Sequence, residues 1–93
     1  MGKYRLAFKN SVAKDLRSIP NVDVQGILER FDELASNPRP LGSEKLSGQE
    51  RYRVRQGDYR IIYEIDDDVL VVVVVKVGHR REVNTATHGE RLV

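Results

Sequence analysis

The stretch YRVRQGDYRIIYEI, residues 52–65, predicts two β-strands joined by a tight turn. Residues that favour strands alternate or cluster in both arms: tyrosine and valine in 52–56, and tyrosine and isoleucine in 59–65. Gly57 and Asp58 lie between the arms and are typical turn residues. We therefore expect a β-hairpin with these two residues at its tip.

Alternation of side chains divides this hairpin into two chemically different faces. One face carries the arginines, with Arg53 and Arg55 on the first arm and Arg60, Ile62 and Glu64 on the second. The other face is apolar or aromatic and consists of Tyr52, Val54, Tyr59, Ile61, Tyr63 and Ile65. We expect this second face to pack against helices, which leaves the arginine face open.

The arginine face has two interpretations, and the pattern leaves both open. Like charges opposed on neighbouring strands destabilise a sheet, so such a face usually offers them to an anion or pairs them with an acid. A guanidinium suits phosphate because it is planar, always charged and able to donate two parallel hydrogen bonds. Alternatively, the arginines are solvated, or paired with Glu64 or Asp58.

Two helices are predicted before the hairpin. Apolar residues recur at helical spacing over 12–19, and Pro20 ends that helix. A second helix follows, with Asn21 or Asp23 as its cap. Its apolar stripe consists of Val24, Ile27, Leu28, Phe31, Leu34 and Ala35.

The segments around the helices have weaker signals. Alternation over 4–8 predicts a short strand before them. The pair 37–38, Asn-Pro, ends the second helix because a residue before proline avoids the helical region. Residues 38–49 are predicted as a loop, with Leu41 and Leu46 as anchors into the core.

The chain after the hairpin predicts one further strand. The acidic residues 66–68 form a turn, and the valine-rich run 69–77 forms the strand. Because that run lacks alternation, we expect it to be the central strand, covered on both faces. Residues 79–87 would form a short final helix or an extended segment.

This order of elements predicts an α+β fold in a single domain, residues 1–93. The expected architecture is a two-helix hairpin packed on a twisted, mostly antiparallel four-stranded sheet. The order is β-α-α-β-β-β plus a short C-terminal helix or tail.

Composition narrows the function. The 93 residues include no cysteine, which excludes disulfides and thiolate metal sites. The net charge is only +2, yet four arginines fall within 51–60 against one acid, and Arg80 and Arg81 follow as a second basic pair. Such local clustering points to a site for an anion.

We expect no metal and no cofactor, since two histidines and scattered acids form no ligand set. The apolar run 69–75 is too short to span a bilayer, and no signal peptide is visible, so we expect no membrane association and a cytoplasmic location.

The combined motifs resemble the RelE/ParE superfamily of bacterial and archaeal toxins. The likeness rests on the hairpin, on VGHRREV at 77–83 and on PLGSEKLSG at 40–48, and it covers nearly the whole chain. The resemblance implies a toxin of a type II toxin–antitoxin system. A RelE-like member would be a ribosome-dependent mRNA endonuclease that inhibits translation. Its partners would be a cognate antitoxin, a 70S-type ribosome and mRNA, with a toxin–antitoxin hetero-oligomer as the resting form.

The resemblance also assigns roles by position. The implied catalytic residues, acting without metal, are Arg53, Arg55, Arg60 and Arg80. Candidates for proton transfer are His79 and Glu64, and candidates for substrate binding are Arg51, Arg81 and Asn84. The best-known member of the family has a tyrosine for proton transfer where this chain has Asn84, so the resemblance does not carry that role over to this position.

Two other functions are compatible with the same resemblance. One is a ParE-like, non-nucleolytic inhibitor of DNA gyrase. The other is a degenerate toxin that binds its antitoxin without cleaving RNA. The four arginines together favour the nuclease, whereas the missing tyrosine favours the alternatives.

Overall fold

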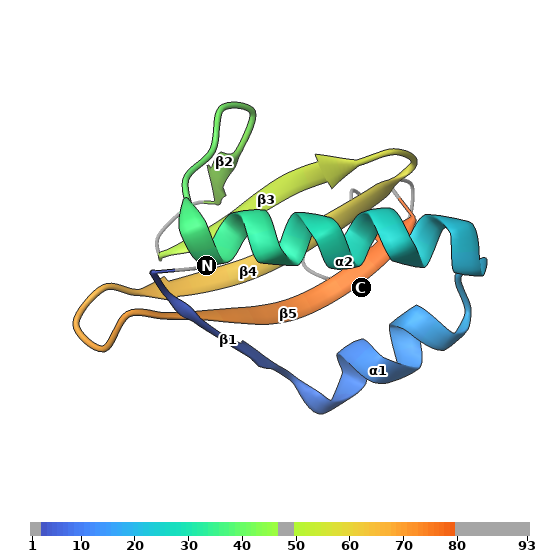
Figure 1. Ribbon diagram of the computed structural model, residues 1–93, viewed down its shortest axis with the longest axis horizontal. Helices are drawn as coiled ribbons and strands as arrows, with labels where there is room; N and C mark the ends of the chain where they lie inside the picture. Colours follow the sequence, from blue (N-terminus) through green and yellow to red (C-terminus); the bar gives the residue numbers. More distant parts are fainter. Residues whose placement is uncertain (1–2, 47–49, 80–93) are drawn as a thin grey trace.

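A computed structural model describes residues 3–46 and 50–79 of the chain. The elements in these ranges are β1 (Arg5–Phe8), α1 (Asn10–Arg17), α2 (Asn21–Ser36), β2 (Glu44–Leu46), β3 (Arg51–Gln56), β4 (Tyr59–Asp66) and β5 (Val71–His79) (Figure 1). Within the described ranges the strands form one sheet in the order β1-β5-β4-β3-β2. β1 runs parallel to β5, and the other neighbours are antiparallel.

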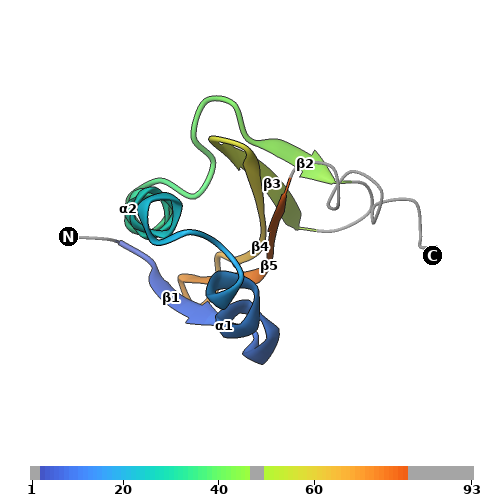
Figure 2. The ribbon, with the colours of Figure 1, turned by 90° about the vertical axis from the view of Figure 1, so that its right-hand side faces the viewer.

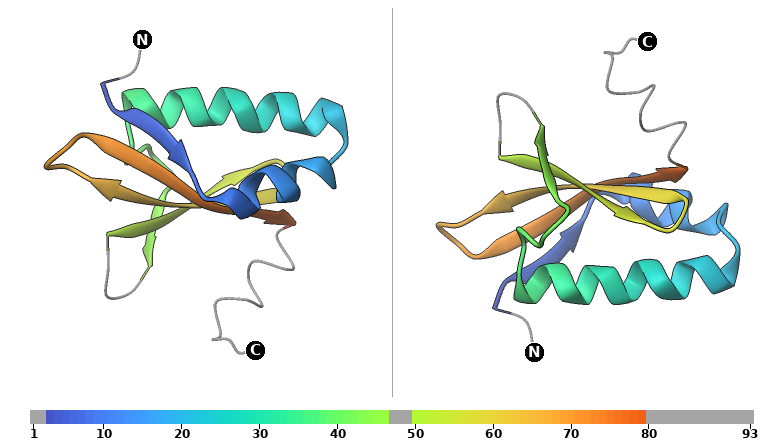
Figure 3. Two further views of the ribbon diagram at one scale, coloured as in Figure 1. Left: turned by 90° about the horizontal axis from the view of Figure 1, so that it is seen from below. Right: turned by 90° about the horizontal axis from the view of Figure 1, so that it is seen from above.

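Both helices lie on the same side of the twisted sheet, and β2 lies toward the other side (Figures 2 and 3). The α2 stripe supplies Ile27, Phe31 and Leu34 to the core, each almost fully buried. Leu28, predicted in the same stripe, is instead largely exposed. None of the helices in the described ranges is long and apolar enough to cross a membrane.

The ends of α2 agree only partly with the prediction. Pro20 precedes the helix, and neither Asn21 nor Asp23 caps it, because the helix already begins at Asn21. Asp23 lies in the first turn, where a negative charge favours the helix dipole. The predicted end is confirmed, since Asn37 before Pro38 adopts an extended conformation.

The core forms where the apolar faces of β3, β4 and β5 meet the helices. Val54, Ile61, Tyr63, Val72 and Val74 are almost fully buried there and join α1 and α2 residues in one cluster. The predicted division of the hairpin is therefore confirmed, because its apolar face is the one that the helices cover.

The sheet has five strands in the described ranges, one more than predicted. The additional strand, β2, lies inside the segment predicted as a loop. It has no strand pattern of its own and is held by pairing with the exposed edge of β3. Leu41 was wrongly predicted as an anchor, since it is fully exposed, and Leu46 is half-buried.

The valine-rich strand also differs from the prediction. β5 begins at Val71, because Val69 and Leu70 belong to the preceding turn and Leu70 has a positive φ of 56°. β5 is an interior strand, but β4 occupies the centre of the five. Its residues alternate between buried and half-buried up to Val74, so the prediction that both faces are covered is wrong.

Tyr63 leads to a prediction about alkaline stability. Its side chain is fully buried, and its hydroxyl donates a 2.7 Å hydrogen bond to the Pro38 carbonyl. Burial raises the pKa of this phenol from 10.0 to about 12. Because the folded-state pKa is the higher one, the neutral phenol stabilises the fold fully below pH 10, and that contribution is lost as the pH rises through about 12.

We expect urea unfolding to show a fall in the free energy of unfolding between these two pH values, and Tyr63→Phe to reduce that fall. At neutral pH the variant should be less stable by about 1–2 kcal/mol, because the Pro38 carbonyl loses its donor. An unchanged alkaline fall in Tyr63→Phe would contradict the assignment.

Candidate functional site on the open face of the sheet

The β3–β4 hairpin places arginines on the sheet face away from the helices. In the register of the two strands, Arg55 is directly opposite Arg60, and Arg53 is opposite Ile62. Gly57, at the tip, has a φ of +60°, a conformation that glycine adopts without steric cost. The turn therefore fixes which arginines face each other.

Three of the predicted catalytic residues surround one hollow. Arg53, Arg55 and Arg60 line a space of about 210 Å³, together with Gly42 and Glu44. Residues directly opposed on antiparallel strands have Cβ atoms roughly 4.5–5.5 Å apart, and like charges placed there raise the local positive potential of the hollow. The arrangement can bind an anion with several oxygen acceptors, such as a phosphate.

Glu44 is the acidic residue that lines this hollow within the described ranges. It is opposite Arg53 in the β2–β3 register, and the Arg53 Nε atom donates to its Oε1 atom at 3.1 Å. The hydrogen bond and charge of Arg53, and then the charge of Arg60, hold the pKa of Glu44 below its ordinary value. The sequence interpretation missed Glu44 because it placed this residue in a loop.

Arg51 and Glu64 form an ion pair with each other. They are opposite in the β3–β4 register, and the Arg51 Nε atom donates to the Glu64 Oε2 atom at 3.0 Å. Neither residue lines the arginine hollow. The structure thus places a predicted substrate-binding residue and a predicted proton-transfer residue in a contact that neutralises both charges.

His79 lies on the helix side of the sheet. It is opposite Tyr59 in the β4–β5 register, and the two rings meet edge to face with centroids 5.8 Å apart. Together with Asp15 and Lys76 it lines a separate hollow next to α1. His79 is therefore not brought to the hollow that Arg60 lines. The other predicted site residues, Arg80, Arg81 and Asn84, lie outside the described residues.

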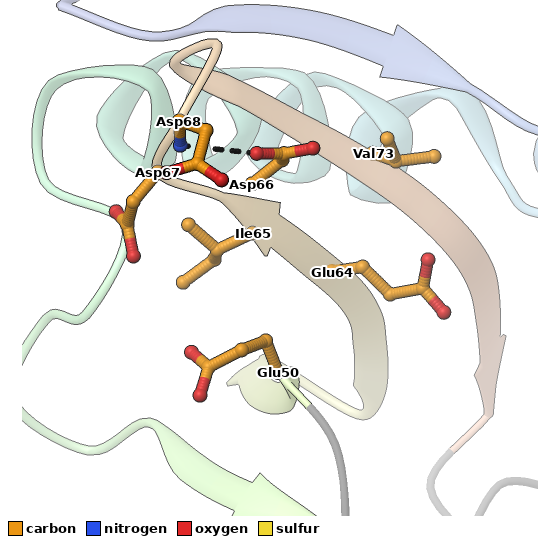
Figure 4. A pocket seen from close by; sticks show the side chains of 7 residues that line it. All are labelled: Glu50, Glu64, Ile65, Asp66, Asp67, Asp68 and Val73. Atoms are coloured by element: carbon orange, nitrogen blue, oxygen red, sulfur yellow. Dashed lines mark hydrogen bonds between the residues drawn. The ribbon is translucent and has the colours of Figure 1, made fainter.

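A larger hollow, of about 520 Å³, lies at the opposite end of β4 and is lined mainly by acids (Figure 4). These acids are Glu50, Glu64, Asp66, Asp67 and Asp68. Their negative charge repels phosphate, so this hollow is a poor candidate for an anion site despite its size. In the part of the chain that the structure describes, no three or more histidine, cysteine, aspartate or glutamate side chains are grouped so that they could hold a metal ion.

Several of these acids are held by ion pairs within the protein. The Arg39 Nη2 atom donates to Asp67 at 2.8 Å and to Glu50 at 3.1 Å, and Lys45 Nζ donates to Glu50 at 2.9 Å. The hydrogen bond from Arg39, followed by that from Tyr4, lowers the pKa of Asp67. This network connects the loop after α2 with the β4–β5 turn, so we interpret it as structural.

Comparison with known proteins identifies the class of protein. Residues 6–84 match the family described as the ParE toxin of type II toxin–antitoxin system, parDE. Toxin RelG of Mycobacterium tuberculosis is 30% identical over 86% of this chain and 94% of its own length. The mRNA interferase toxin RelE of Escherichia coli K12 is 28% identical over 83% of each chain. In the toxin–antitoxin complex RelBE2 from M. tuberculosis, one chain superposes with a TM-score of 0.73 at 29% identity, covering 83% of this chain and 98% of that one.

These matches agree with the fold, in which two helices cover one face of a small mixed sheet as in RelE structures. The chain belongs to the RelE/ParE superfamily of toxins from type II toxin–antitoxin systems.

The geometry of the turn can be tested with Gly57→Ala. We expect this variant to lose about 1–2 kcal/mol of stability, because an L side chain is strained at a φ of +60°. Asp58→Ala is the matched control in the same turn, since Asp58 is exposed and its φ is not positive. Urea unfolding of both variants provides the measurement, and equal stability of the two would contradict a strained position at Gly57.

Proposed function

We propose that this toxin is a ribosome-dependent mRNA endonuclease that cleaves messenger RNA in the ribosomal A site. The observation that carries the proposal is the convergence of Arg53, Arg55 and Arg60 around one hollow on the face that the helices leave open. The E. coli relative described as an mRNA interferase supports the same activity.

The reaction needs mainly electrostatic stabilisation. A ribose 2′-hydroxyl attacks the adjacent phosphorus, the bond to the 5′-oxygen of the next nucleotide breaks, and a 2′,3′-cyclic phosphate and a 5′-hydroxyl result. Negative charge builds up on the phosphate oxygens in the transition state, and guanidinium groups stabilise it. Arg60 would supply this stabilisation with Arg80, and Arg53 and Arg55 would orient the RNA backbone. The role of Arg80 rests on the family resemblance.

The described residues provide few groups for proton transfer. Glu64 is paired with Arg51, and His79 lies on the helix side of the sheet. Arginine is a poor base because it stays protonated. A ribosome can compensate by holding the messenger in the reactive geometry, which contributes roughly 7–11 kcal/mol in favourable cases. The proposal therefore includes weak cleavage of RNA that no ribosome holds. It also includes a cytoplasmic site of action.

A cognate antitoxin completes the proposal. The M. tuberculosis neighbour is described as part of a toxin–antitoxin complex. We expect this chain to form a hetero-oligomer with a partner that carries an acidic, partly disordered segment, because such a segment would complement the arginine face and fold on binding.

A second candidate function is the inhibition of DNA gyrase. It is favoured by the match to the ParE toxin family and by the ion pairs that already engage Arg51 and Arg53. The two functions differ in their cellular effect. Loss of plasmid supercoiling with intact messenger would support gyrase inhibition, whereas A-site cuts would support the nuclease.

Arg60→Ala tests the nuclease directly. We expect the rate of A-site cleavage on programmed ribosomes to fall roughly 10²- to 10³-fold, because the transition state loses a preorganised cation. Primer extension on the messenger measures the cuts. The matched control is Arg17→Ala, which removes an exposed arginine of α1 and should leave cleavage unchanged. Full cleavage by Arg60→Ala would refute the assigned role.

A further inference from the structure

The arginine hollow already holds an anion that belongs to the protein itself. The carboxylate of Glu44 accepts hydrogen bonds from the Nε and Nη2 atoms of Arg53, both at its Oε1 atom. These two donors form the edge of the guanidinium that binds an oxyanion with two parallel hydrogen bonds. A phosphodiester, with two unesterified oxygens, would use the same edge.

The position of Glu44 makes this contact easy to displace. β2 has only three residues and lies at the edge of the sheet, where β3 is its neighbour. The Glu44 side chain is 64% exposed, whereas that of Arg53 is 20% exposed. Exposed ion pairs are weak because water and salt screen them. A stronger or locally concentrated anion can therefore replace the carboxylate while Arg53 stays in place.

We propose that Glu44 is an internal competitor of the RNA phosphate, which makes it a residue that determines specificity for ribosome-held messenger over free RNA. This inference rests on the proposed function, in which the arginine cluster binds an RNA phosphate. Free RNA must displace the carboxylate at its bulk concentration. Messenger held by the ribosome presents its phosphate at a high effective concentration and displaces Glu44 readily.

The charge of Glu44 persists at neutral pH. Arg53 and then Arg60 lower the pKa of its carboxyl group, so the side chain stays ionised and competes with phosphate. The same environment makes Glu44 a weak base, because a carboxylate that is stabilised by two cations holds a proton poorly. Competition with phosphate therefore explains its position better than proton transfer does.

Glu44→Gln tests the inference, since it removes the charge and keeps the shape of the side chain. The probe is a fluorescently labelled single-stranded RNA hexamer with 2′-O-methyl groups, which cannot be cleaved. Anisotropy titrations of the full chain at constant ionic strength measure its dissociation constant. We expect Glu44→Gln to bind the probe about tenfold more tightly, because a like charge beside the phosphate is removed.

The matched control is Glu33→Gln. Glu33 is also 64% exposed and also paired with an arginine, Arg30, but it lies on α2. The two variants change the net charge equally, so a general charge effect would tighten binding equally in both. Equal tightening, or no tightening in Glu44→Gln, would overturn the competitor role.

Two further measurements separate the inference from the proposed function. If Arg55→Ala, which removes a residue proposed to orient the RNA backbone, weakens probe binding but Glu44→Gln leaves it unchanged, the phosphate site stands and the competitor role fails. If Arg55→Ala has no effect on binding, the phosphate site itself fails, and the inference fails with it. In cleavage assays with ribosome-free RNA, Glu44→Gln should cut faster than the unchanged protein. A large loss of cleavage with unchanged binding would instead identify Glu44 as a base and refute the inference.

Discussion

The structure depends on the burial of one face of the β3–β4 hairpin beneath α2. Val54, Ile61 and Tyr63 are almost fully buried there with Ile27 and Phe31 of the helix. Side chains alternate with a period of two, so a slip of one residue in either strand would carry arginines into the core. Burying an unpaired charge is far more costly than exposing an apolar side chain. Core burial therefore fixes the position of the arginines on the other face.

The open face of the sheet is divided by charge. Arg53, Arg55 and Arg60 lie near the β3–β4 turn, and the acidic hollow lies near the β4–β5 turn at the other end of β4. Glu64 lines the acidic hollow and is paired with Arg51, its neighbour on β3. A polyanion that approaches this face is attracted at one end and repelled at the other, which favours one orientation of its backbone. The net charge of +2 for the whole chain conceals this division.

Two features of the site could not be read from the sequence, for different physical reasons. Glu44 belongs to a three-residue strand whose pairing is determined by the available edge of β3, so no local pattern marks it. His79 lies on the face opposite to the one that strict alternation along β5 would give it, because the strand contains a bulge. The β4–β5 register shifts between Ile62 and Tyr63, so that Tyr63 pairs with Val74 and Ile62 with Lys76. An extra residue in one strand reverses the alternation beyond it, and His79 thus lies on the helix side with Tyr59.

The sequence by itself determined the two helices, the hairpin and the common face of Arg53, Arg55 and Arg60, because helical and strand periodicity are local properties of the chain. Only the tertiary structure decided that β2 joins the sheet, that Glu44 forms an ion pair with Arg53 and that Glu64 forms one with Arg51. Those contacts join residues from separate strands. Their partners depend on strand order and register, which no single segment of the sequence encodes.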